Sequence, residues 1–440
     1  MTAGAAPTMG RMTTTTGAGT GPTDPGDAAG PTGPVGERTA EARAERAGPR
    51  GRAPAGPAGP SQRLALLDVV RGVAILGTLM TNVWIFTAPG GEWGVLSGSG
   101  GAPGFASGSV GDAAETVFRA VADGKFLSLL TILFGAGIAL QYAAAERRGL
   151  PWPGRYRWRA LFLFAEGTVH FVLVFAWDVL MGYAVTALYV AWLLSRSERA
   201  RRRAMWWAGG LHLALMLLLT AALALGGSAA GAGGVPPRVV DLYAHGSWPD
   251  QIAFRLENAV VLRVEPVLTF GLLVFLFLLG VRLLRAGAFG ADAAGRRLRV
   301  RMLAWGLGLG VPLNAACVLA GEAGFLPGRY VAAPLVAVGY AGLIGLLVDR
   351  VRRPGLLMGA CTSLGRAALS GYVLQNVLCV LVAYGVGLGL AARLGDAWRP
   401  WWVMGLWVAV SLVLLVGSSL WLRRFGSGPL EALQRRALRH

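Results

Sequence analysis

Residues 264–286 read VEPVLTFGLLVFLFLLGVRLLRA, an apolar run that is long enough to cross a bilayer and ends in arginines. Nine more runs of this kind occur along the 440 residues. Interpreted as spanning helices, the ten runs lie near 65–86, 125–145, 159–177, 179–195, 204–227, 264–286, 301–320, 330–349, 367–391 and 401–422. The sequence therefore predicts an all-α, polytopic integral membrane protein with about ten transmembrane helices.

Arginine clusters fall in every second gap between these runs. They include Arg147, Arg148, Arg155 and Arg157; Arg196, Arg199 and Arg201 to Arg203; Arg285, Arg296, Arg297 and Arg299; Arg350, Arg352 and Arg353; and Arg423, Arg424, Arg435, Arg436 and Arg439. Because basic residues near helix ends stay on the cytoplasmic side, this asymmetry predicts the orientation. We expect both termini in the cytoplasm and a multi-pass protein of the plasma membrane.

The composition agrees with a membrane protein. Hydrophobic residues make up 54% of the chain and charged residues 15%, values that a soluble globular domain rarely has. The net charge of +18 is concentrated in short loops beside the predicted helices, where contact with anionic lipid explains it. The lipid bilayer is therefore the expected partner, and we expect no nucleic-acid partner.

The chain divides into three predicted regions. Residues 1–60 are rich in Gly, Ala, Pro, Thr and Arg and contain no apolar run, which predicts a disordered cytoplasmic tail. Residues 61–425 form the ten-helix membrane domain, and residues 426–440 form a basic cytoplasmic C-terminal tail. Two outer loops, 87–124 and 228–263, have a length typical of lids, binding surfaces or disordered segments.

Ionisable residues inside the predicted spans are the most informative positions. A charge at the bilayer centre costs roughly 3 kcal/mol or more, so it is seldom kept without a partner or a task. Asp68 and Arg71 lie at the cytoplasmic end of the first span, spaced to share one face, and Asn82 follows about three turns deeper. They indicate either a structural ion pair or part of a polar site.

The third predicted span carries Glu166 and His170, which point the same way because they are four residues apart. A histidine whose tautomer is fixed by a carboxylate is the arrangement expected of a general base. The alternative is a histidine bonded to a neighbouring backbone carbonyl. Asp178, just beyond this span, could orient the histidine instead, or cap the N-terminus of the next helix.

Two further segments place polar residues in or beside spans. Lys125 begins the second predicted span, ahead of a Gly135-x-Gly137 pair that allows close helix approach. The ninth predicted span has Arg366 at its cytoplasmic mouth and two amides, Gln375 and Asn376, near mid-depth. Amides at that depth must form hydrogen bonds, and either a neighbouring helix or a substrate would satisfy them.

Five motifs occur in order along residues 61–440. They are the segment from Arg63 to Asn82, Lys125-Phe126 leading into LFGAG at 133–137, Gly167-x2-His170 followed by Asp178 and Tyr183, the run from Gly365-Arg366 to Gln375, and FGSGPLE at 425–431. In this order they resemble the YeiB-like bacterial membrane proteins, a family defined by domain of unknown function 418. Each motif is weak alone, and the series of five is specific.

The resemblance implies a distant relation to membrane acyltransferases of the heparan glucosaminide acetyltransferase type, which move an acyl group from cytoplasmic acyl-CoA to a sugar across the membrane. These relatives share an Asp-x2-Arg-Gly opening like Asp68 to Gly72, with an asparagine farther along as at Asn82. They also rely on a histidine in the loop after the first helix, but no histidine occurs from 87 to 124. His170 resembles the YeiB-like position and is the intramembrane candidate.

The leading hypothesis is acyl transfer from cytoplasmic acyl-CoA to an extracytoplasmic glycan or lipid acceptor. Arg71 and Arg366 would hold the phosphates, because an arginine fork suits phosphate oxygens. His170, supported by Glu166 or Asp178, would take the acceptor's proton. The carbonyl oxyanion would be stabilised by Asn82, Gln375 or Lys125.

We expect acyl-CoA as a co-substrate, no tightly bound cofactor and no metal site. One alternative is a transporter or flippase for a small solute or lipid precursor, because ionisable residues inside the membrane also suit proton-coupled transport. A further alternative is a non-enzymatic membrane partner protein.

Overall fold

A computed structural model describes residues 60–99, 101–106, 108–225, 234–351, 353–394 and 398–438. These residues all lie in one compact unit. The predicted N-terminal tail, except for Pro60, lies outside the described residues. Within them the chain is helical and contains no strand, which confirms the all-α prediction.

The helices follow one another along the described residues. They are α1 (Pro60–Phe86), α2 (Gly91–Gly94), η2 (Val95–Ser99), α3 (Val110–Ala122), α4 (Lys125–Arg147), α5 (Tyr156–Leu173), α6 (Leu180–Leu194), α7 (Glu198–Leu225), α8 (Pro237–His245), α9 (Trp248–Glu257), α10 (Ala259–Leu262), α11 (Val264–Leu268), α12 (Phe270–Arg285), α13 (Ala293–Leu319), η4 (Gly321–Gly324), α14 (Phe325–Pro327), η5 (Gly328–Ala332), α15 (Ala333–Arg350), α16 (Leu356–Arg366), α17 (Ala368–Ala383), α18 (Leu390–Arg393), α19 (Arg399–Phe425) and α20 (Pro429–Ala437).

Six helical stretches are long and apolar enough to cross a membrane: 65–86, 110–147, 198–225, 293–319, 321–350 and 399–425. A seventh results if α16 and α17, which meet at 94°, are taken together as one broken span. Each of the ten predicted runs overlaps a helix, but α6 is apolar and shorter than a full span. The described residues therefore have the helices of a membrane protein.

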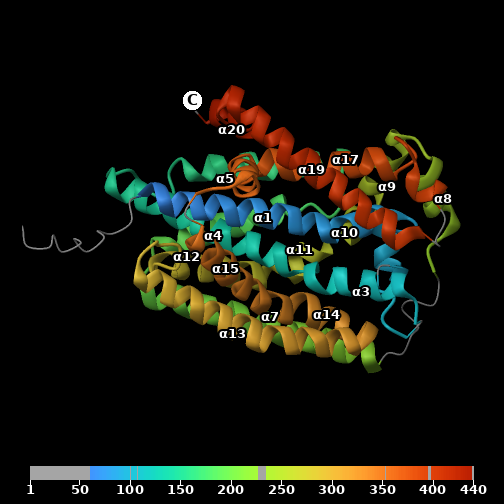
Figure 1. Cartoon of the computed structure of the whole chain (residues 1–440), viewed down its shortest axis with the longest axis horizontal. Helices are drawn as coiled ribbons and strands as arrows, with labels where there is room; N and C mark the ends of the chain where they lie inside the picture. Colours follow the sequence, from blue (N-terminus) through green and yellow to red (C-terminus); the bar gives the residue numbers. More distant parts are fainter. Residues whose placement is uncertain are drawn as a thin grey trace, which may run out of the picture. The chain divides into compact units, whose positions relative to one another are not determined.

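Helix α1 lies at the centre of the unit, where it contacts α4, α16, α17 and α19 (Figure 1). On the other side of α4, α12 packs closely against it, and α13 packs along α15. One hydrophobic core lies around α4, α6 and α12, and a second lies around the C-terminal half of α1 with α17 and α19. Polar side chains of α1 and α17 therefore meet inside the protein.

Glycines set the closest helix contacts. A Cβ atom at Gly135 of α4 would overlap the carbonyl oxygen of Phe277 in α12, and one at Gly280 of α12 would overlap that of Ile132 in α4. The predicted close approach at Gly135 is therefore present. Gly137 takes no part in it, because a Cβ atom at this residue would have no neighbouring atom within 4 Å. The close approach predicted for the Gly135-x-Gly137 pair is thus made by Gly135 alone.

The contact between α1 and α16 is equally close. A Cβ atom at Gly72 would overlap the carbonyl oxygen of Cys361, and one at Gly365 would overlap that of Asp68. The two backbones can approach this closely only because neither glycine carries a side chain. This contact holds the break between α16 and α17 against the first turns of α1.

We expect Gly365→Ala to lower the free energy of unfolding by about 1–3 kcal/mol, because the added methyl group forces two backbones apart. Thermal unfolding of the purified protein in detergent measures the effect. Gly359→Ala is the matched control on the same helix: its added Cβ meets no atom within 4 Å, so stability should stay equal or rise. Equal melting temperatures for the two variants would contradict the packing argument.

The predicted outer loops 87–124 and 228–263 contain short helices. Residues 87–124 carry α2, η2 and α3, and α3 leads directly into α4; residues 234–263 carry α8, α9 and α10. The turn between α5 and α6 is longer than predicted, because α5 ends at Leu173 and α6 begins at Leu180. The intervening backbone is held by side chains from both outer segments, as described next.

Candidate functional site

Four buried or half-buried polar side chains are linked to one another by hydrogen bonds inside the protein. His170 Nδ1 lies 3.1 Å from Asp178 Oδ1, and His170 Nε2 lies 3.3 Å from Asn376 Nδ2. Asn82 Nδ2 donates to Asn376 Oδ1 at 3.2 Å. Asn82 comes from α1, His170 from α5, Asn376 from α17 and Asp178 from the turn before α6. We call these four residues the polar chain.

The bonding pattern determines the tautomer of His170. Asn376 uses its oxygen to accept from Asn82, so its amide nitrogen faces the histidine and donates. Nε2 of the neutral ring is therefore the acceptor, and Nδ1 carries the hydrogen that points to Asp178. Tyr372 packs edge-on against the ring, with centroids 5.4 Å apart. This is the orientation in which a histidine can receive a proton at Nε2.

Asp178 fills both roles that its sequence position left open. One carboxylate oxygen contacts His170, and the other accepts from the backbone N–H groups of Leu180 at 2.9 Å and Met181 at 3.2 Å, at the start of α6. Gly167 makes room for it, because a Cβ there would lie 2.6 Å from Asp178 Oδ2. The carboxylate is therefore held by a helix end as well as by the histidine.

Glu166 does not take part in this arrangement. Its two carboxylate oxygens are buried and have no hydrogen-bond partner, so the side chain one turn from His170 is not the one that orients it. The backbone bends after Leu173, which brings Asp178 back against the histidine, and helical spacing alone does not reveal this bend.

The turn that carries Asp178 is bound by side chains from both outer segments. Glu92 Oε1 accepts from Ala176 N at 2.9 Å, and Trp248 Nε1 donates to Leu173 O at 2.8 Å. Arg255 Nη1 donates to Val172 O at 3.2 Å, and Arg263 Nη1 donates to Asp178 O at 2.8 Å. We call four residues the turn clamp: Glu92, Trp248, Arg255 and Arg263. They were not predicted as site residues. Their partners in the turn are backbone atoms, so the sequence carries no pattern that pairs them with it.

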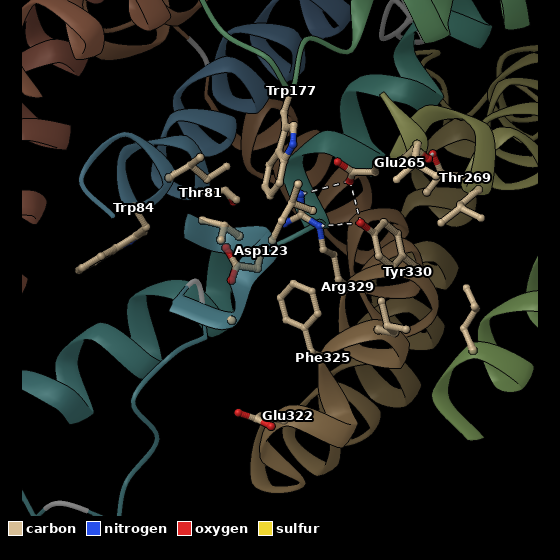
Figure 2. A pocket seen from close by; sticks show the side chains of 18 of the residues that line it. Thr81, Trp84, Asp123, Trp177, Glu265, Thr269, Glu322, Phe325, Arg329 and Tyr330 are labelled. Carbon is tan, nitrogen blue, oxygen red and sulfur yellow. Dashed lines mark hydrogen bonds and ion pairs between the residues drawn. The ribbon is translucent and has the colours of Figure 1, made fainter. Parts of the chain in front are cut away.

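The described residues also enclose a cavity of about 350 Å³. Figure 2 shows side chains that line it. Its walls include Thr81, Trp84 and Trp177, and its polar side carries Glu265, Arg329 and Tyr330. Tyr330 OH donates to Glu265 Oε1 at 2.7 Å, and Arg329 Nη2 lies 3.6 Å from the same oxygen, as the dashed lines in Figure 2 show. A smaller cavity shares Thr81, Trp177 and Arg329 with it and is lined by Asn82 and Tyr372. The large cavity is thus adjacent to the smaller one, which Asn82 of the polar chain lines.

Lys125 lies in another part of the core. It follows Gly124, whose φ of 76° is left-handed and where a Cβ would lie 2.5 Å from the carbonyl oxygen of Arg329. Its Nζ donates to Asn314 Oδ1 at 2.7 Å, and Asn314 in turn donates to Ala120 O. The ammonium group is buried and bonded between α4 and α13, and it does not contact the polar chain.

Asp68, Arg71 and Arg366 lie at the other end of α1. Arg71 Nη1 pairs with Asp68 at 3.0 Å and donates to Gly365 O at 3.3 Å, whereas Arg366 is exposed and donates to Gly426 O at 3.1 Å. Arg71 and Asn82 are eleven residues apart, about 16 Å along the helix axis. These three residues do not line the cavity beside Asn82. Seven of the predicted site residues therefore form two groups, at different positions along α1, and Lys125, Glu166 and Gln375 belong to neither.

Gln375 belongs to neither group by contact. It is fully buried, and neither its amide oxygen nor its amide nitrogen has a hydrogen-bond partner. Its neighbour Asn376 faces the polar chain, so Gln375 points to a different side of α17. An unpaired buried amide costs free energy, which makes it a candidate contact for a ligand.

Sequence comparisons place the chain among proteins of unknown activity. Residues 283–439 match the model of a family described as "Protein of unknown function (DUF418)". The chain is 26% identical over 396 residues to the uncharacterized protein YxaH of Bacillus subtilis (strain 168), a match that covers 86% of this chain and 94% of the relative. It is 27% identical over 399 residues to the uncharacterized protein YeiB of Escherichia coli (strain K12), where the match covers 85% and 96%. These matches confirm the kinship that the five motifs predicted.

Proposed function

We propose that this YeiB-like protein is a membrane-embedded acyltransferase that moves an acyl group from cytoplasmic acyl-CoA to an acceptor on the outer side. The observation that carries the proposal is the buried Asp178–His170 pair, in which Nδ1 faces the carboxylate and Nε2 faces the Asn376 amide. A carboxylate that holds an imidazole in this way is typical of general-base sites.

In this proposal the chain crosses the plasma membrane ten times with both termini in the cytoplasm, as the arginine pattern predicts. The end of α1 with Asp68 and Arg71 then faces the cytoplasm, and Asn82 with the large cavity lies in the outer half of the membrane. Donor and acceptor would approach the polar chain from opposite sides.

The chemistry assigns the proton transfer to His170 and the stabilisation of the oxyanion to Asn82 and Asn376. The acceptor hydroxyl or amine displaces the Asn376 amide from His170 Nε2, and its oxygen or nitrogen attacks the thioester carbonyl of the acyl-CoA. His170 takes the proton of the attacking group and gives it to the departing thiolate, so that the C–S bond is replaced by an ester or amide bond. The amide nitrogens of Asn82 and Asn376 are the nearest donors for the carbonyl oxyanion.

In this proposal, acyl-CoA, the acyl donor, is bound at the cytoplasmic end, where Arg71 and Arg366 lie. Arg366 is exposed and suits a phosphate of acyl-CoA, whereas Arg71 is engaged with Asp68 and Gly365 and would act mainly by holding α1 against α16. The acyl arm would then have to cover the distance from this end to Asn82. Gln375, with both amide atoms unpaired, is a candidate contact on α17.

Acyl transfer is tested with the purified protein in lipid nanodiscs and radiolabelled acetyl-CoA. We expect saturable binding of acetyl-CoA and transfer of label to an acceptor extracted from the source membranes, with Arg366→Ala weakening the binding. The matched control is Arg353→Ala, an exposed arginine that precedes α16. If the protein neither binds acetyl-CoA nor transfers label, the proposal is wrong.

A transporter is the second candidate, because α16 and α17 form a helix broken at 94° and discontinuous helices are common at transport sites. The two functions differ in a simple measurement. Transfer of label that stays covalently attached after denaturation supports the acyltransferase, whereas counterflow of a solute in sealed vesicles supports transport.

A further inference from the structure

The large cavity has two chemically different walls. Met216, Leu219 and Leu223 of α7 form an aliphatic wall together with Val264 and Leu268 of α11. Glu265, Arg329 and Tyr330 form a bonded polar wall. At about 350 Å³ the cavity has the size of a small-molecule site. Such a division suits a molecule with an apolar part and a polar part.

The aliphatic wall continues onto the protein surface. Leu223 and Val264 line the cavity and are themselves 56% and 42% exposed. On the same helix as Leu223, Leu217 and Leu218 are exposed without lining the cavity. On a spanning helix, exposed leucines contact lipid, because a cluster of apolar side chains is unfavourable in water. A ligand can therefore enter from the bilayer with its alkyl chain along α7.

The charged side chains that line the whole cavity indicate the kind of head group that it can hold. The cations that line the cavity are Arg119, Arg329 and Arg399, and the acids are Asp123, Glu265 and Glu322. Three positive and three negative groups leave no net charge, so an anionic head group gains little attraction over a neutral one. A lining that contains both donors and acceptors does suit hydroxyl groups, which need both.

We propose that this cavity binds a membrane-resident amphiphile with one alkyl chain and an uncharged, hydroxylated head group, and that this amphiphile is the acyl acceptor. The identification as acceptor rests on the proposed function; the binding site does not. The smaller cavity lined by Asn82 and Tyr372 adjoins the polar wall, so a head-group hydroxyl is directed towards the polar chain.

The experiment uses the full-length protein in nanodiscs and decyl glucoside carrying a photoreactive diazirine in its alkyl chain. After irradiation, the labelled peptides are identified by mass spectrometry, and unlabelled decyl glucoside and decyl phosphate compete for the site. We expect label on α7 and α11 near Leu219 and Leu268, with decyl glucoside competing at least as well as decyl phosphate. Stronger competition by decyl phosphate, or label spread evenly over lipid-facing helices, would overturn the proposal.

Leu219→Trp should weaken saturable labelling by at least about tenfold, equivalent to about 1.4 kcal/mol, because the indole fills the aliphatic wall. Leu218→Trp, one residue away and outside the cavity, should label as the wild type does. Leu223→Trp is a second cavity variant on an exposed position, in case Leu219→Trp does not fold. Equal labelling of the cavity and control variants refutes the site. Normal labelling by a wild-type protein that transfers no acyl group would refute the proposed function alone.

Discussion

Replacing His170 with alanine is expected to lower acyl transfer by about 10²–10⁴-fold, the usual contribution of a positioned general base. The imidazole is the member of the polar chain that has one ring nitrogen beside a carboxylate and the other facing an amide, the arrangement of a general base. Transfer of label from acetyl-CoA, at equal amounts of folded protein, measures the effect.

Alanine at this position also removes the histidine partner of Asp178 Oδ1 and of Asn376 Nδ2, so the loss of a base must be separated from a loss of structure. His170→Gln keeps a polar side chain of similar reach and should remain folded but nearly inactive. His245→Ala is the matched control: His245 pairs with Asp241 four residues before it, but both are exposed. Wild-type rates in His170→Gln would show that the ring is structural.

Replacing Glu92 with alanine is expected to lower the free energy of unfolding by about 2–6 kcal/mol. Glu92 is fully buried, accepts from Ala176 N and accepts from Tyr384 OH at 3.2 Å. Each buried donor left without a partner costs roughly 1–3 kcal/mol. The freed turn also carries Asp178, so transfer should fall together with stability. Thermal unfolding and hydrogen exchange of residues 172–178 measure the two effects.

Two variants make this result specific. Glu257→Ala removes an exposed carboxylate from the other outer segment and should leave unfolding unchanged. Glu92→Gln keeps one oxygen acceptor and should lie between the wild type and Glu92→Ala. If Glu92→Ala unfolds like the wild type and the peptide 172–178 exchanges no faster, the turn clamp does not hold the site.

The sequence predicted the candidate histidine but only part of its surroundings. His170 stood out because an ionisable side chain in an apolar run is costly, and Asp178 because it lies eight residues on, at a predicted turn. Glu166 was the carboxylate that helical spacing favoured, yet it is unpaired. Spacing rules assume that the helix continues, and here it ends at Leu173.

The contacts of Asn82 could not be predicted from the sequence, for a related reason. Asn82 and Asn376 are 294 residues apart, and their hydrogen bond depends on how α1 and α17 pack. That packing follows from glycines such as Gly72 and Gly365, whose effect is seen only when the facing backbone is known. The same holds for Lys125, whose partner Asn314 is 189 residues away.

The sequence by itself determined that this is a helical protein with helices apolar and long enough to span a membrane, and which of its polar residues need an explanation. Both conclusions depend on the free-energy cost of placing each residue in an apolar run. This cost is local, so it can be judged from the residues that are neighbours in the sequence. Only the tertiary structure decided which polar residues meet: His170 with Asp178 and Asn376, and Glu92 with the turn between α5 and α6. Hydrogen bonds act over about 3 Å, so their partners are chosen by the packing of distant helices and by backbone groups that all residues share.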